Sequence, residues 1–146
     1  MTLTEAERSF LAAQRHGHLA TVAPNGSPQV KPVGFSYNEE RGTIDIAGMN
    51  MAGSAKYKNV RANPLVSLVA DDVPAPEEGA AGVRFMEIRG TAETATADEE
   101  DPTGHLAPEI IRIHPRRVLA FNVDGPGLRV RDDDAGTYAQ SERWPA

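Results

Sequence analysis

The sequence predicts a mainly β domain, a small antiparallel barrel of about six strands with roughly two or three short helices packed outside it. Three observations predict this fold. The chain has 146 residues, the length of a single domain, so residues 1–146 are expected to form one unit. Hydrophobic residues make up 40% of the sequence, enough for a core, and they occur in short runs separated by turn residues. Two other segments have the spacing of amphipathic helices.

The N-terminal half is expected to form a helix followed by a β-meander. Thr4 is a typical N-cap residue and Glu7 follows it as in a capping box, which predicts a helix over residues 4–14. Asn25-Gly26 is typical of a tight hairpin turn. Pro32 has no N–H to donate and predicts an edge position or an interrupted ladder for its strand. Strands are predicted at 18–23, 29–37 and 43–47.

The C-terminal half is expected to add one helix and further strands. Ser54 is a natural N-cap and Asn63-Pro64 is a stop signal, which predicts a helix over 54–62. Residues 71–82 and 96–104 are expected to be surface loops, the second of them acidic. Strands are predicted at 66–70, 83–95 and 118–123, a short helical turn at 108–114, and a Gly- and Asp-rich tail at 125–146.

Composition and charge exclude several classes of protein. Fifteen Lys and Arg against 21 Asp and Glu give a net charge of −6, which disfavours binding to nucleic-acid phosphates. The absence of Cys excludes disulfides, thiolate nucleophiles and Cys-ligated zinc. No stretch approaches the roughly 18 apolar residues of a membrane span, and no signal-peptide pattern is visible. We therefore expect a cytoplasmic protein with no nucleic-acid or membrane partner.

The usual catalytic motifs are also missing. The four His residues lack metal-ligand spacing, so no metal site is predicted. There is no Gly-x-Ser-x-Gly elbow and no Gly-rich nucleotide loop. Tyr37, Tyr57 and Tyr138 are proton-donor candidates by chemistry alone, and packing is the simpler interpretation of each. No catalytic side chain is assigned, and a bound cofactor would have to supply any difficult chemistry.

The segment 48–64 is the most informative part of the sequence. It follows a predicted strand, carries small residues at 52–54, and opens a helix with Lys56 in its first turn. Small residues let an anion approach the backbone, and free N–H groups, a helix dipole, a hydroxyl and an ammonium group together suit a phosphate. The alternative is an ordinary capped surface helix whose basic residues are solvated, and spacing alone does not separate the two interpretations.

Several motifs dispersed along the chain carry a family resemblance. They are Ala20-Thr-Val-Ala-Pro, Pro28-Gln-Val, Lys56-Tyr, Asn59-Val-Arg-Ala-Asn-Pro64, Val69-Ala-Asp-Asp-Val73, Ile88-Arg-Gly-Thr-Ala92 and Ile111-Arg-Ile-His-Pro115. In this order they resemble the pyridoxamine 5′-phosphate oxidase-like superfamily, whose fold is the FMN-binding split β-barrel. Within it, the sequence looks most like the actinobacterial reductases that use the deazaflavin F420, of the oxytetracycline-pathway type. The resemblance spans most of the chain.

This resemblance implies a homodimer that binds its cofactor in a groove at the subunit interface and acts on a small molecule. Ser54 and Lys56 would bind the cofactor phosphate, and Pro32 and Val33 would lie beneath the ring. Lys31 would replace a phosphate- or ring-contacting Arg, with a solvated lysine as the alternative. The cofactor-binding set implied is Lys31, Pro32, Val33, Asn50, Met51, Ser54, Ala55, Lys56 and Trp144.

Two C-terminal segments enter through the same resemblance. Arg129 and Arg131 resemble the substrate-end Arg-x-His of the oxidases, and pairing with nearby carboxylates is the alternative. Arg143-Trp144-Pro145 resembles the family's terminal Arg-Leu-x-Pro, which reaches the partner subunit's site. A loose terminal tail is the competing explanation for Trp144.

Departures from the oxidase pattern point away from vitamin B6 chemistry. Ser-Arg-Lys becomes Ser54-Ala55-Lys56 and Arg-Gln-Val becomes Arg84-Phe85-Met86, so one phosphate-binding charge and one flavin-contacting amide are missing. The acidic run Asp98–Asp101 would repel a dianionic substrate. We therefore expect an F420-dependent oxidoreductase that transfers a hydride between reduced cofactor and an electron-poor organic substrate. The alternatives are an FMN-dependent oxidoreductase, a non-catalytic flavin- or deazaflavin-binding protein, and an interaction module without a cofactor.

Overall fold

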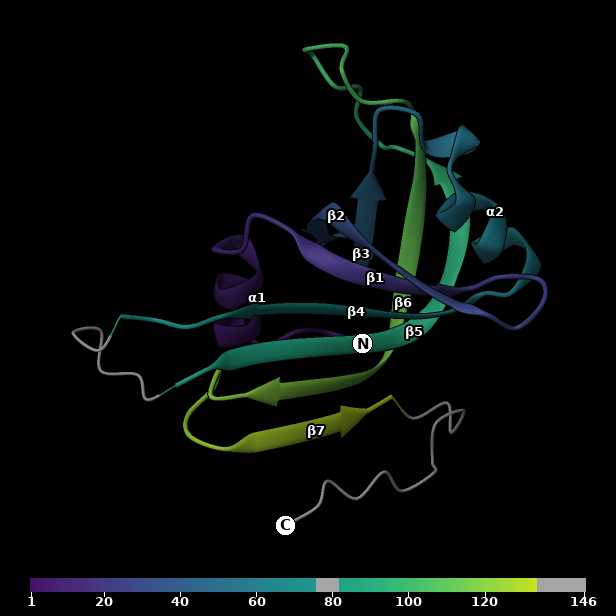
Figure 1. Cartoon of the computed structure of the whole chain (residues 1–146). Helices are drawn as coiled ribbons and strands as arrows, with labels where there is room; N and C mark the ends of the chain where they lie inside the picture. Colours follow the sequence, from purple (N-terminus) through teal and green to yellow (C-terminus); the bar gives the residue numbers. More distant parts are fainter. Residues whose placement is uncertain (76–81, 134–146) are drawn as a thin grey trace.

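The computed structural model describes residues 1–75 and 82–133 (Figure 1). This part of the chain forms one antiparallel sheet with two α-helices and a short 3-10 turn. In chain order the elements are α1 (Glu5–Ala12), β1 (Gly17–Val22), β2 (Pro28–Asn38), β3 (Thr43–Ala47), η1 (Met51–Gly53), α2 (Ala55–Ala62), β4 (Leu65–Asp72), β5 (Arg84–Thr96), β6 (Glu109–Phe121) and β7 (Leu128–Asp132).

The first six strands close into a barrel. Their order is β3-β2-β1-β4-β5-β6, and pairing of β3 with β6 completes the ring. The 13-residue β6 divides its second edge between two partners, because residues 111–113 pair with β3 and residues 117–121 pair with β7. Within the described residues, β7 therefore extends the sheet beyond the closed barrel.

A β-bulge accompanies this change of partner along β6. The β5–β6 register shifts between Arg89 and Gly90, which leaves Arg116 as the extra residue of β6. The two strands approach so closely here that a Cβ on Gly90 would stand 2.2 Å from the carbonyl oxygen of His114. The position therefore requires glycine, and the bulge allows one long strand to serve both the barrel and its extension.

Alternating side chains fill the barrel. Along β5, Met86 and Ile88 are at most 1% exposed, whereas Glu87 and Arg89 lie on the outer face, as the sequence alternation predicts. Helix α1 adds apolar side chains to the same core, and its capping box is formed as predicted. Helices α1 and α2 lie on opposite sides of the barrel (Figure 1).

Most of the predicted elements are confirmed, including the antiparallel barrel, both helices and the N-terminal meander. The Asn25-Gly26 turn is present, with Gly26 at a φ of 85° and the N–H of Ala23 bonded to the carbonyl of Ser27 at 2.9 Å. Pro32 lies in the half of β2 that pairs with β1 alone and has an unpaired second edge, in line with the edge position that its missing N–H predicts. These features have local sequence signals, which is why they could be predicted.

Two predictions in the C-terminal half are wrong. Residues 109–114 belong to β6 instead of a helical turn, because pairing with β3 and β5 buries Ile110, Ile111 and Ile113 in a strand. The segment predicted as a tail contains β7 at Leu128–Asp132. Its arginines and aspartate alternate with Leu128 and Val130 on an exposed strand, a pattern that resembles a polar loop in composition.

Candidate functional site

Strand β2 changes partner at its midpoint, and this leaves part of its edge unpaired. Residues 28–33 pair with β1, and residues 34–38 pair with β3. The edge of residues 28–33 that faces away from β1 therefore has no strand beside it in the described part of the chain; we call it the open edge. Lys31 and Pro32 are exposed here, whereas the side chain of Val33 is buried in the core. Val33 could contact a ligand only through its backbone.

The N-terminus of α2 supplies backbone N–H groups, the anion-binding donors that the sequence predicts for this segment. The hydroxyl of Ser54 donates to the Met51 carbonyl at 2.6 Å and accepts from the N–H of Tyr57 at 3.3 Å, so it caps the helix. The first N–H groups of an α-helix have no intrahelical acceptor, which leaves those of Ala55 and Lys56 to bind an anion. Ser54 thus shapes this end of the helix, and the neighbouring N–H groups offer the donors.

The loop before α2 is compact. Met51 is completely buried and anchors the loop in the core, while Asn50 is exposed. A Cβ on Gly53 would stand 2.7 Å from the Nδ2 atom of Asn50, so the absence of a side chain at Gly53 makes room for that amide. Of these two predicted site residues, the structure makes Asn50 accessible and gives Met51 a packing role.

The lysines of the chain are gathered at these two elements. The sequence has three of them, Lys31, Lys56 and Lys58, and none forms an ion pair among the described residues. Unpaired ammonium groups beside free backbone N–H groups fit a phosphate group. The open edge together with Asn50–Lys56 is therefore the candidate cofactor site. Gln29 of the open edge is joined to α2 by a hydrogen bond from Asn59 at 2.9 Å.

The two arginines predicted to bind substrate lie on β7, and both contact carboxylates. Arg131 pairs with the buried Glu7 of α1 and donates to the carbonyl oxygen of Thr2 at 3.2 Å. Arg129 lies 3.9 Å from Asp124. These contacts are the pairing that the sequence left open as the alternative, and substrate binding by either arginine stays a prediction. Trp144 lies outside the described residues.

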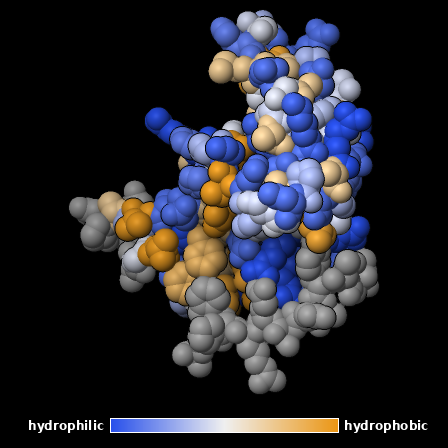
Figure 2. All heavy atoms as spheres, turned by 45° about the vertical axis from the view of Figure 1, so that its right-hand side comes forward, coloured by the Kyte–Doolittle hydropathy of each residue, from blue (hydrophilic) through white to orange (hydrophobic). Residues whose placement is uncertain are grey.

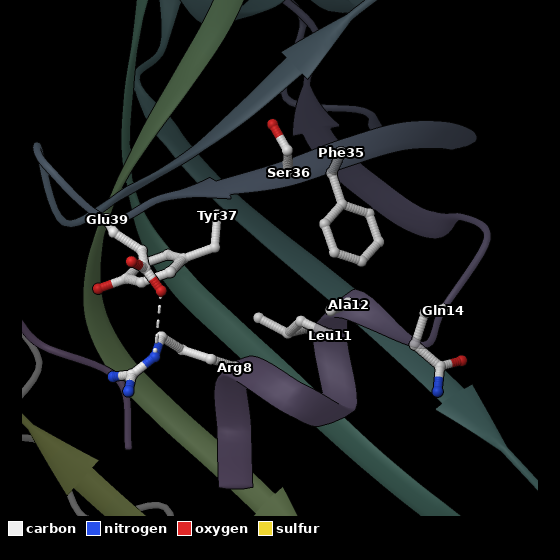
Figure 3. Close-up of a pocket in the computed structure, with 8 residues that line it drawn as sticks. All are labelled: Arg8, Leu11, Ala12, Gln14, Phe35, Ser36, Tyr37 and Glu39. Atoms are coloured by element: carbon white, nitrogen blue, oxygen red, sulfur yellow. Dashed lines mark ion pairs between the residues drawn. The ribbon is translucent and has the colours of Figure 1, made fainter. Parts of the chain in front are cut away.

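A cavity of about 370 Å³ lies between α1 and the second half of β2, where that half lacks β1 as a neighbour (Figure 3). Phe35, Leu11 and Tyr37 point into it, and Arg8 pairs with Glu39 at 3.4 Å beside Tyr37. The sequence did not predict this cavity, because α1 and β2 form its walls only after folding and neither segment carries a recognisable binding motif.

An ion-pair network, which we call the closing seam, joins β3 to β6. Arg112 binds both carboxylate oxygens of Asp45 at 3.0 and 2.9 Å and lies 3.3 Å from Asp98. Arg41 donates two hydrogen bonds to Asp98, and these bonds lower the pKa of that carboxyl to about 2. Burial raises the pKa of Asp45, but its bonds from Arg112, Asn38 and Thr43 outweigh burial and the pKa is lowered.

The acidic run was predicted to be a solvated connection, and it has a second role. Glu99 and Glu100 are exposed, but Asp98 ties the run to the closing seam. The run also lines a hollow of about 700 Å³ beside Ala47 at the end of β3. The hollow carries four consecutive carboxylates, from Asp98 to Asp101, so it disfavours an anionic ligand.

Comparison with known proteins identifies the family. The family model described as pyridoxamine 5′-phosphate oxidase matches residues 3–126. The chain belongs to this family. It is also 42% identical over 135 residues to a 5a,11a-dehydrotetracycline/5a,11a-dehydrooxytetracycline reductase of Streptomyces rimosus, a match that covers 90% of this chain and 94% of that protein. The family match and this relative show an oxidoreductase.

Solved structures of the same fold include proteins named for flavin-type cofactors. An F420 reductase superposes with a TM-score of 0.57 and 24% identity, over 80% of this chain and 98% of the other. An FAD-binding protein of Mesorhizobium loti superposes with a TM-score of 0.57 and 21% identity, over 81% and 94%. At these identities the superpositions show that the chain shares the fold of these proteins. Among the described residues, no helix is long and apolar enough to span a membrane.

Proposed function

We propose that the chain is an F420-dependent reductase that transfers a hydride between reduced cofactor and an electron-poor double bond of an organic substrate. The observation that carries the proposal is a pair of lysines without an ion-pair partner among the described residues, Lys31 on the open edge and Lys56 in the first turn of α2. They occur in a chain that is 42% identical to a dehydrotetracycline reductase. When bound, the deazaflavin would supply the hydride chemistry, and the chain would bind, orient and shield it.

The candidate site fits the phosphate of such a cofactor. Lys56 and the N–H groups of Ala55 and Lys56 present positive charge at the start of α2. Lys31 adds a second cation on β2, and exposed Pro32 offers an apolar surface for a flat ring. Position 55 has no cation, in contrast to the Arg of the oxidase pattern, which favours a cofactor with a less highly charged phosphate than that of FMN.

The substrate proposed is a neutral or cationic polycyclic compound with a conjugated carbon–carbon double bond. The named substrates of the Streptomyces relative are dehydrotetracyclines, which belong to this class. The acidic hollow beside β3 supports the assignment, because Asp98–Asp101 disfavour a dianion such as a pyridoxal phosphate. Vitamin B6 oxidation is accordingly not proposed.

We further propose that the chain acts as a homodimer. The candidate site is open to solvent, and the outer face of the barrel near it carries exposed apolar side chains, among them Val30 at 61% and Leu65 at 45% exposure. A shallow apolar cavity of about 240 Å³ continues this face over β1 and β4. Figure 2 shows hydrophobic residues in a strip bordered by hydrophilic ones. Such a surface favours a protein partner, and a second copy would also help to enclose the cofactor.

The double variant Val30→Asp with Leu65→Asp tests the homodimer, and it is expected to yield monomers in sedimentation experiments.

Parallel titrations with F420 and FMN, followed by quenching of the single tryptophan Trp144, test the cofactor assignment. Micromolar or tighter binding of F420 with weaker FMN binding is expected. Oxidation of reduced F420 in the presence of a dehydrotetracycline-type enone then tests the activity. Preference for FMN would overturn the cofactor assignment, and tight F420 binding without turnover of any acceptor would indicate a carrier protein.

A further inference from the structure

A buried amide connects the two halves of the candidate cofactor site. Asn59 is only 4% exposed, although it lies on the short helix α2. Its Nδ2 group donates one hydrogen bond to Thr21 Oγ1 at 3.0 Å and another to Gln29 Oε1 at 2.9 Å. Both N–H bonds of the amide are therefore used, one toward β1 and one toward β2. A buried polar side chain with all its donors satisfied fixes the geometry of what it joins.

The hydrogen bonds of Asn59 lie close in sequence to both lysines of the candidate site. Gln29 precedes Lys31 by two residues, so both side chains lie on the same side of β2. Asn59 follows Lys56 by three residues, which is close to one turn of α2. The hydrogen bonds of Asn59 therefore lie close in sequence to Lys31 on one side and to Lys56 on the other. Thr21 and Gln29 are register partners in the β1–β2 ladder, so one amide ties the helix to both strands.

A second buried contact of α2 lies toward the barrel interior. Val60 is 3% exposed and anchors the helix in the barrel core. That contact holds α2 against the interior, whereas the two bonds of Asn59 tie the helix directly to β1 and to the open edge of β2. Hydrogen bonds are directional and specify a spacing that apolar packing leaves free.

We propose that Asn59 is a positioning residue for the cofactor site. Through Gln29 and Thr21 it holds the N-terminus of α2, which binds the cofactor phosphate, at a fixed distance from the open edge, which contacts the ring. This inference rests on the proposed function. It predicts that Asn59 contributes to the binding of a ligand that reaches both halves and contributes little to the binding of one that contacts the open edge alone.

The test compares F420 with the phosphate-free deazaflavin riboside in fluorescence titrations. Asn59→Ala is expected to raise the Kd for F420 about tenfold and to change the Kd for the riboside less than about twofold. In a Lys56→Ala background, Asn59→Ala should add less than about twofold, because both changes act on the same phosphate contact. Asn63→Ala is the matched control, since Asn63 is the C-cap residue of the same helix and its side chain, among the described residues, accepts a local hydrogen bond from the N–H of Leu65 at 3.0 Å.

Two milder variants keep the test decisive if Asn59→Ala folds poorly. Gln29→Leu removes the contact with β2 and should weaken F420 binding more than Thr21→Val, which removes the contact with β1. Equal loss of affinity for both ligands, or a larger effect of Thr21→Val, would show a general structural role and overturn the inference. If the native chain bound F420 and all variants matched it, only this inference would fail. If the native chain bound neither F420 nor FMN, the proposed function would fail with it.

Discussion

The closing seam and the open edge use charge in opposite ways, although both involve strand β2 or its hairpin partner. At the closing seam, Arg41 and Arg112 are each held by carboxylates at hydrogen-bond distance. At the open edge and the start of α2, Lys31 and Lys56 have no carboxylate partner in the described residues. Paired charges specify how the barrel closes, and unpaired charges remain available to a ligand.

This difference also explains the choice of residue. Arg binds a carboxylate through two parallel N–H groups, as Arg112 binds Asp45, and so fixes the orientation of two strands. Lys has a compact charge on a flexible stem, which suits an exposed phosphate site. The comparison predicts that changes at the closing seam alter stability and leave cofactor binding intact, whereas changes at the candidate site do the reverse.

Arg112→Ala should produce the largest effect, on stability. It leaves Asp45 largely buried without its main partner, which we expect to lower the free energy of unfolding by about 3 kcal/mol. For a chain of this size the midpoint of thermal unfolding should fall by about 10 °C. Arg112→Met combined with Asp45→Asn removes both charges and should restore much of the loss. A loss of F420 affinity at temperatures where the variant is folded would contradict the claim that the closing seam affects stability alone.

Lys56→Ala should have the largest effect on binding. Loss of a charge-assisted contact to phosphate is expected to raise the Kd for F420 about 30-fold, with little change in the thermal midpoint, because Lys56 has no protein partner among the described residues. Higher salt should weaken binding by the native chain more than by the variant. Lys58→Ala, on the exposed side of the same helix, is the control, and an equal effect there would indicate a diffuse electrostatic attraction instead of a site.

The sequence predicts the parts of this comparison that have local signals. Ser54 caps α2, Asn25-Gly26 makes the hairpin, and Lys56 is in place at the start of the helix. The contacts that organise each region join residues far apart in the chain, 67 positions for Arg112 and Asp45 and 30 for Asn59 and Gln29. A periodic pattern contains no information on such pairs, because they depend on strand register.

The same limit explains the errors at the C-terminal end. β6 carries apolar residues on both faces where it pairs with β3 and β5, so the two-residue period of a strand is lost in its sequence. β7 has the alternation but is short and rich in Arg and Asp. The site residues on the open edge could be located only by resemblance, since Lys31 in an alternating strand has the appearance of any solvated lysine.

Gly53→Ala tests the packing of the candidate site with a smaller expected effect. The added Cβ would displace the amide of Asn50, which is the far end of an exposed side chain, so the thermal midpoint should change little. We expect the Kd for F420 to rise about threefold as the loop before α2 adjusts. Gly90→Ala is the contrasting variant, because its Cβ meets the backbone oxygen of His114 and should lower the thermal midpoint strongly. An equal fall of the thermal midpoint in both variants would show that Gly53 is needed for stability and would contradict its assignment to the site alone.

Acid titration of the closing seam should show the smallest effect. The bonds from Arg41 lower the pKa of Asp98 from 3.8 to about 2, so ionised Asp98 stabilises the fold above pH 3.8 and this contribution is lost as the pH falls toward 2. Asp98→Asn should therefore be less stable than the native chain near neutral pH, and the difference should shrink between about pH 4 and 2. Urea unfolding at several pH values measures this, with Glu99→Gln as the control for a general change in charge. A gap that stayed constant down to pH 2 would show that Asp98 acts through the shape of the loop, since only its charge titrates in this range.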